Sequence, residues 1–152
     1  MSIPFQIQEY DPDQYAMLFA GVAISQGAGQ SGYADGEWFS CKPMAPSFTD
    51  VVGVGGVVVR TKTNDHRVEF TINLLQTCAL NAYLSGIVAA DEGAPNAAGV
   101  GSFALYDLAG TTQIVCPNAW IVQPADITLD KTAKSRVWSF HGIRALYVVG
   151  GN

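Results

Sequence analysis

The segment from His66 to Leu75 alternates between apolar and polar residues, and this alternation constrains the fold more than any other feature of the chain. The apolar residues are Val68, Phe70, Ile72 and Leu74, and polar residues separate them. Side chains that repeat with a period of two lie on alternate faces of a β-strand. The segment therefore predicts a half-buried strand.

Further strands are predicted before and after this segment. A continuous apolar run at 15–24 predicts a strand buried on both faces. Residues 57–62 are expected to form a hairpin with 66–75, because Asn64 and Asp65 between them tolerate the backbone angles of a turn. The remaining strands are expected at 37–42, 48–52, 102–107, 113–122 and 136–149.

One segment has a helical period instead. Apolar residues recur at i, i+3, i+4, i+7 and i+8, as expected for one face of an α-helix over 78–92: Leu80, Tyr83, Leu84, Ile87 and Val88. Thr77 is the expected N-cap and Gly93 the expected stop. About seven strands and one helix predict a mainly β fold, with two packed antiparallel sheets in a sandwich or barrel-like arrangement flanked by the helix.

The length of 152 residues fits a single domain over 1–152. Residues 1–13 are polar and carry Pro4 and Pro12, so they are predicted to form an extended N-terminal arm. Prolines and glycines are frequent in 41–56, which is predicted as a long inter-strand loop around the short 48–52 strand. Residues 126–135 have mixed charge and are expected to be exposed.

Composition limits the function. Charged residues make up 14% of the chain and hydrophobic residues 49%, whereas an average soluble domain has about 25% charged residues. Much of the surface is therefore expected to be covered by other subunits. The net charge of −5 argues against a general nucleic-acid binder, which needs a basic face.

The cysteines, Cys41, Cys78 and Cys116, are odd in number and predict free thiols in a reducing cytosol. No signal peptide is expected, because the N-terminus lacks a basic stretch followed by an apolar run. The longest apolar run is also too short to cross a bilayer, so membrane insertion is not expected.

No catalytic, cofactor-binding or metal-binding residue is predicted, and the chain is not expected to be an enzyme. Residues 27–32 match G-x-G-x-x-G, but further turn residues follow where a dinucleotide site needs a helix. Residues 53–56 lack the Gly-Lys-Ser/Thr ending of a phosphate loop. His66 and His141 have no Cys or His at metal-ligand spacing.

Several segments, in their order and spacing, resemble a family of small phage tail tube proteins. They are Asp35-Gly36-Glu37, residues 59–65, Thr71 to Thr77 with Leu-Leu-Gln-Thr at its end, Asn81, Leu84, and the C-terminal Val149-Gly150-Gly151-Asn152. The resemblance runs from about Ile24 to the end of the chain. The sequence departs from the family in an insertion near 43–46 and in Cys78, where Ser is expected.

The resemblance implies two packed sheets flanked by one helix, in a fold related to the tube protein of type VI secretion. It also implies hexameric rings that stack into the tube of a contractile tail, through which viral DNA is ejected without specific binding. The implied partners are other copies of the chain and the sheath, baseplate and tail terminator proteins. The implied location is the virion tail, after assembly in the cytoplasm of the host bacterium.

Within that family, the 41–56 loop is the expected contact to the next ring, and 1–13 and 146–152 are the expected subunit contacts. Glu69, on the polar face of its strand, is a candidate for the channel lining. Two alternatives stay open: a tail terminator or another ring-forming tail component, and a small β-barrel ligand-binding module.

Overall fold

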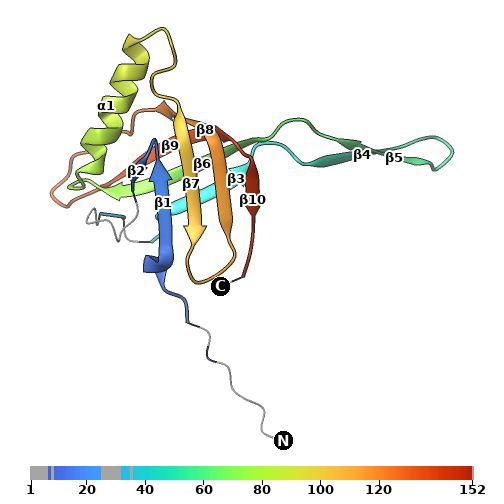
Figure 1. Cartoon of the computed structure of the whole chain (residues 1–152), viewed down its shortest axis with the longest axis horizontal. Coiled ribbons are helices and arrows are strands. Elements are labelled where there is room, and N and C mark those ends of the chain that lie inside the picture. Colours follow the sequence, from blue (N-terminus) through green and yellow to red (C-terminus); the bar gives the residue numbers. More distant parts are fainter. Residues whose placement is uncertain (1–6, 8, 25–31, 35, 152) are drawn as a thin grey trace, which may run out of the picture.

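The computed structural model describes residues 7, 9–24, 32–34 and 36–151 (Figure 1). A single turn of 3₁₀ helix, Pro12–Gln14, leads into the first strand. The strands are β1 (Tyr15–Phe19), β2 (Val22–Ala23), β3 (Phe39–Pro43), β4 (Phe48–Val52), β5 (Val58–Lys62), β6 (Arg67–Leu75), β7 (Gly101–Asp107), β8 (Gln113–Gln123), β9 (Ser135–Ile143) and β10 (Leu146–Val148), and the helix is α1 (Leu80–Gly93).

The strands form two antiparallel sheets. Seven follow the order β2-β1-β7-β8-β9-β6-β3, with β10 also paired to β8, and this makes an eight-stranded sheet. The other sheet contains only β4 and β5. The predicted mainly β fold with two antiparallel sheets and one helix is confirmed. Among the described residues, the large sheet does not close into a barrel, because its two end strands, β2 and β3, do not pair with each other.

The large sheet curls so that distant strands pack face to face. Phe70 on β6 stacks on Phe103 of β7, with ring centroids 4.2 Å apart, and on Phe140 of β9 at 4.8 Å. Strands β8 and β9 separate β6 from β7 in the sheet. The contact between Phe70 and Phe103 therefore requires the two halves of the sheet to face one another across a shared core.

The predicted alternation in β6 is confirmed, since Val68, Phe70, Ile72 and Leu74 are all buried. Helix α1 adds Leu80, Leu84 and Val88 to the same core. The predicted helix over 78–92 is found two residues later at its start, and Ala79 stands at the N-cap without a side-chain hydrogen bond, so the expected capping by Thr77 is wrong.

Asn81 replaces that cap as the polar anchor of the helix. Its amide nitrogen donates to the carbonyl oxygen of Leu75 at 2.9 Å, and its amide oxygen accepts a hydrogen bond of 2.9 Å from the indole of the buried Trp138. The helix is thus joined to both β6 and β9 by one side chain.

The predicted 15–24 strand is wrong as a single element. Ala20 and Gly21 both have positive φ, 51° and 81°, and they reverse the chain so that Phe19 pairs with Val22. Two consecutive residues with positive φ match the two-residue turns that join hairpin strands. The apolar run concealed this turn because neither residue is polar.

The predicted hairpin between 57–62 and 66–75 is also wrong. Strand β5 pairs with β4, from Val58↔Val52 to Lys62↔Phe48, whereas β6 pairs with β3 and β9. Asn64 and Asp65 therefore lie in a link between two ladders, and the chain does not reverse there. The segment 41–56, predicted as a long loop, therefore contains more strand than expected. Strand β3 continues to Pro43, and the predicted 48–52 strand is confirmed as β4.

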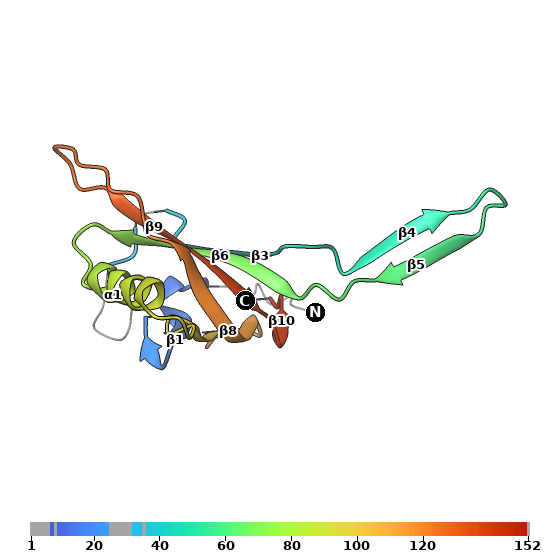
Figure 2. The ribbon, with the colours of Figure 1, turned by 90° about the horizontal axis from the view of Figure 1, so that it is seen from above.

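The predicted 136–149 strand is divided into β9 and β10 by Arg144 and Ala145. Both parts run along β8, and the amide of Ala145 donates to the carbonyl of Val115 at 2.8 Å. Figure 2 shows the result from above: the curled sheet and α1 form a body, and the β4–β5 hairpin extends far beyond it at one end.

Candidate functional site

The β4–β5 hairpin is the most unusual surface of the molecule. All ten residues of its two strands are exposed, and Figures 1 and 2 show it standing clear of the body. It nevertheless carries a run of valines, of which Val51, Val52, Val58 and Val59 are each about 60% exposed or more. Two-stranded ribbons are marginally stable alone, so this hairpin needs another surface to pack against.

The two faces of the hairpin differ in charge. Directly paired residues share a face, which places Val51 with Val59 and Thr49 with Thr61 on a face without charged residues. The opposite face carries the pairs Asp50–Arg60, Phe48–Lys62 and Val52–Val58. On that face the guanidinium of Arg60 lies 3.6 Å from the centroid of the Phe48 ring. The Thr and Val face is therefore the one suited to an apolar contact.

Two polar contacts fix the base of the hairpin. The Asp65 carboxylate accepts hydrogen bonds from the Arg67 side chain at 2.8 and 2.9 Å and from the Arg67 backbone at 3.1 Å. These bonds lower the pKa of Asp65 to about 2. Arg144, between β9 and β10, reaches Ser47 at 3.4 Å from the other side. The Asp65–Arg67 pair orders the segment between β5 and β6, and the Arg144–Ser47 contact links the hairpin base to the large sheet.

The outer face of β3, β6, β9 and β8 is mainly polar, although Val137 and Ile143 of β9 are also exposed on it. One row across it contains Lys42, Glu69, His141 and Trp120 from successive strands. Lys42 and Glu69 lie 3.7 Å apart as an exposed ion pair, and the hydroxyls of Ser40 and Thr71 meet at 2.8 Å in the next row. Glu69, the predicted channel residue, thus lies on this face, but it is neutralised by a neighbouring lysine.

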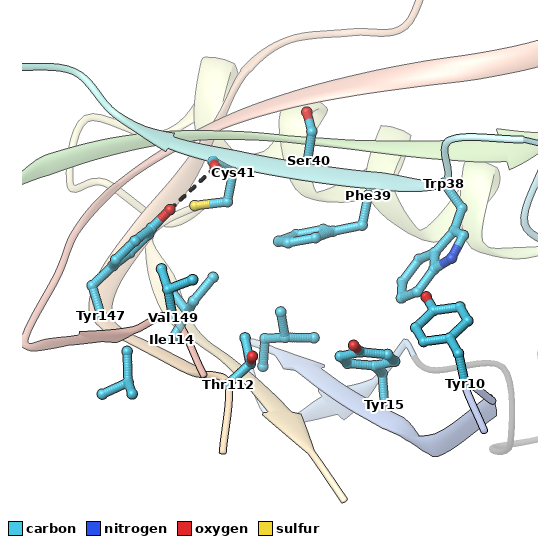
Figure 3. Close-up of a pocket in the computed structure, with 12 residues that line it drawn as sticks. Tyr10, Tyr15, Trp38, Phe39, Ser40, Cys41, Thr112, Ile114, Tyr147 and Val149 are labelled. Atoms are coloured by element: carbon cyan, nitrogen blue, oxygen red, sulfur yellow. Dashed lines mark hydrogen bonds between the residues drawn. The ribbon is translucent and has the colours of Figure 1, made fainter. Parts of the chain in front are cut away.

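A cavity of about 310 Å³ opens where the curled sheet fails to close. Figure 3 shows Tyr15, Trp38 and Phe39 facing into it from one side and Tyr147 from the other. The Tyr147 hydroxyl donates to the carbonyl oxygen of Cys41 at 3.2 Å, which joins β10 to the edge strand β3. Its walls are mostly apolar, and its polar side chains are few.

The thiols near this cavity are held protonated. Burial raises the pKa of Cys41 to about 12 and that of Cys116 to about 11. A thiol with such a pKa is a poor nucleophile at neutral pH. All three cysteines, Cys78 included, are free thiols, as predicted from their odd count.

The C-terminal segment lies against the turn between β7 and β8. The amide of Gly150 donates to the Thr112 hydroxyl at 3.2 Å, and this hydroxyl also lies 3.3 Å from the Gly150 carbonyl oxygen. A Cβ on Gly150 would lie 2.7 Å from the carbonyl carbon of Thr111, so only glycine fits there. Gly150 thus has a packing reason inside the chain, whereas a Cβ on Gly151 would meet no atom within 4 Å.

The histidines and cysteines considered in the sequence as metal ligands do not form a metal site in the described part of the chain. His66 is exposed, His141 is half-buried and Cys116 is buried. Within the described part of the chain, no group of three His, Cys, Asp or Glu side chains is placed to hold a metal ion. Of the predicted glycine loop, residues 27–31 lie outside the described residues, and so do 1–6 and 8 of the predicted arm.

Sequence reasoning missed the projection of the hairpin and the uncharged face that it carries. The signal was present as the nine-residue uncharged stretch from Val51 to Val59, but it was divided between a loop and a strand. Among the described residues, none of the helices has the length and apolar character needed to cross a bilayer.

No protein-family model matches the sequence, and no curated protein matches it. A solved structure does resemble the fold: the cryo-EM structure of the anti-feeding prophage cap, described as the AFP tube terminating cap, aligns with a TM-score of 0.58. The alignment covers 93% of this chain and 93% of the cap chain, at 9% sequence identity. The two chains therefore share a fold over nearly their whole lengths.

Proposed function

We propose that this chain is a structural, non-catalytic subunit of a phage tail or a related tail-like particle, and specifically the subunit of its tube. In this proposal, six copies form a ring and the rings stack into a tube that conducts DNA. The particle is assembled in the bacterial cytoplasm, and the protein ends in the virion tail, in contact with sheath, baseplate and terminator proteins.

The projecting β4–β5 hairpin is the observation that carries the proposal. On an isolated molecule, an exposed ribbon with an uncharged face of Thr and Val residues lowers solubility and promotes aggregation. It is favourable when a neighbouring copy covers it. A repeated contact of this kind is what a stacked assembly requires.

The polar face of β3, β6, β9 and β8 suits the wall of a channel. Its charges are balanced, with Lys42 beside Glu69, and Arg67 beside Asp65. A wall of this kind holds no excess of positive charge to bind phosphates, so DNA would slide past it. The free edge strands β2 and β3 offer places where neighbouring subunits can continue the sheet.

A tail terminator is the second candidate, and the likeness to the anti-feeding prophage cap favours it. A terminator needs the same ring as a tube subunit but stacks on one side only. The hairpin is compatible with both roles, because either protein needs one contact to the adjacent ring.

Negative-stain electron microscopy of the purified protein over a range of concentrations tests both candidates. Long hollow filaments are the expected result for a tube subunit, and single rings are the result for a terminator. A monomer that stays monodisperse at every concentration, and also in the presence of preformed tail tubes, would rule out both.

A further inference from the structure

A second apolar feature lies at the end of the body opposite the hairpin. A groove of about 290 Å³ separates α1 from the loop between β8 and β9. We call it the α1 groove; Ala82 and Ser85 of α1, Pro124, Ala125 and Ile127 of the loop, and Trp138 of β9 line it. Figures 1 and 2 both show α1 and this loop at one end of the long axis and the hairpin at the other.

Apolar side chains at the groove stay exposed, because the described part of the chain does not cover them. Ile127 and Leu129 on the loop are 79% and 77% exposed. The one charged residue of the lining, Arg136, donates to the carbonyl oxygen of Thr128 at 3.2 Å and so supports the loop. The cavity is smaller than most ligand pockets, but a few aliphatic side chains fill a space of this size.

The hairpin tip, residues 53–57, has the matching properties. Val54 is fully exposed and Val57 is 68% exposed. Hydrogen bonds from Gly53 to the Val57 carbonyl and from Gly56 to the Gly53 carbonyl, at 2.8 and 2.9 Å, close the tip into a compact turn. Its glycines allow close approach to another surface, and the tip itself carries no charge that has to be desolvated on contact.

We propose that the hairpin tip of one copy seats in the α1 groove of the next copy, with Val54 as the inserted side chain. One molecule cannot fill its own groove, because tip and groove lie at opposite ends. The contact is therefore head to tail, and such a contact does not close on itself in a pair. It closes into a ring if the rotation between copies allows it and otherwise propagates along an axis, and the proposed ring-to-ring contact is the second case. This inference rests on the proposed tail function. It identifies the α1 groove as the surface that receives the hairpin tip in the contact between rings.

A single tip covers much less than the ~800 Å² per partner of a standard interface. Stacking therefore requires several tips to act together, as the six copies of a ring would. This explains how an exposed apolar tip is tolerated on the free subunit: one contact is weak, and only a ring makes it strong.

Disulfide trapping tests the contact directly. The variant carries Val54→Cys and Ser85→Cys, in a Cys41→Ala background that removes the only half-exposed native thiol. Mild oxidation of the assembled protein is expected to give a ladder of covalent multimers of three or more chains. The matched control pairs Val54→Cys with Leu108→Cys, which is exposed in the β7–β8 turn, and should give no ladder.

The single variant Val54→Cys distinguishes the alternative geometry. Disulfide dimers from that variant alone would show tip-to-tip contact and would overturn the proposal. Wild-type filaments without a ladder from the double variant would also overturn it and leave the proposed tail function intact. Failure of the wild type to form rings or filaments would instead count against the tail function itself.

A mixing experiment gives an independent test. Val54→Asp damages the tip and Ile127→Asp damages the groove, and both residues are exposed, so neither change disturbs the core. Each variant alone should form rings that do not stack. A mixture should form stacks of two rings, because one variant keeps the tip and the other the groove, whereas filaments from either variant alone would overturn the proposal.

Discussion

The hydroxyl of Tyr147 donates a hydrogen bond to the carbonyl oxygen of Cys41 across the open side of the sheet, at 3.2 Å (Figure 3). The two residues belong to β10 and β3, strands that do not pair with each other. One side chain thus bridges a gap that backbone hydrogen bonds leave open, and it limits how far the curled sheet can spread.

Tyr147→Phe removes this bridge while it keeps the aromatic ring in the cavity. We expect the free energy of unfolding to fall by about 1 kcal/mol, the usual effect of losing one hydrogen bond. Urea denaturation followed by fluorescence measures it. Tyr106→Phe on β7 is the control, because Tyr106 is exposed; an equal loss in both variants would contradict the assigned role of Tyr147.

Gly150→Ala should loosen the C-terminal segment, because a methyl group there would meet the Thr111 backbone at 2.7 Å. We expect a loss of about 1–3 kcal/mol, the usual range for forced overpacking. Gly86→Ala, in an exposed turn of α1 with open space around its Cβ position, should have the opposite sign and stabilise by about 0.5–1 kcal/mol. Thermal denaturation of both variants gives the comparison, and a stabilised Gly150→Ala protein would refute the packing argument.

Asp65 should titrate well below the usual 3.8 for this side chain. Its hydrogen bonds from Arg67 favour the charged carboxylate and lower its pKa to about 2. The stabilisation from this pair is therefore complete above pH 3.8 and is lost as the pH falls through about 2. NMR titration of the carboxyl carbon measures the midpoint, which should move up toward 3.8 in Arg67→Gln and stay low in Lys62→Gln.

Alkaline pH should destabilise the protein through its buried thiols. Burial raises the pKa of Cys41 from 9.0 to about 12 and of Cys116 from 9.0 to about 11. The unfolded chain releases these protons first, so the contribution of the two thiols to stability is constant below pH 9 and falls as the pH rises from 9 toward 11 and 12. Urea midpoints between pH 8 and 10.5 should fall less steeply for Cys41→Ala than for the wild type, and equal slopes would show that this thiol does not contribute.

Local patterns predicted the parts of the fold that a short window can encode. The alternation in β6 and the helical face of α1 are each carried by side chains within a single element, so they were predictable. The turn at Ala20 and Gly21 was not, because it lies inside an apolar run and is fixed by pairing of Leu18 with Ala23. The pairing partner of a strand depends on the whole sheet, so the local pattern predicts the wrong partner, β6, for β5.

The candidate contact surfaces were predictable only in outline. The low charge fraction indicated apolar surface outside the core, and the 41–56 segment, predicted as a loop, overlaps β4 and most of the hairpin tip. The α1 groove had no sequence signal, because Ser85 and Ile127 are brought together by the packing of α1 beside the β8–β9 loop. Glu69 was placed on the polar face by alternation alone, but its neutralisation by Lys42 depends on the register of β3 against β6.

The strand order also determines when this chain can fold. Tyr15 pairs with Asp107, and Arg67 pairs with Ile143, so β1 can join β7 and β6 can join β9 only late in the chain, although β1 can pair with β2 and β6 with β3 earlier. Pairing between such distant segments is slow, because the loop must close before the contact stabilises it. During synthesis, the β4–β5 ribbon is among the first elements able to pair, while the core forms only when nearly the whole chain has left the ribosome. A truncation that removes β9 and β10 should therefore yield an aggregating chain instead of a smaller folded protein.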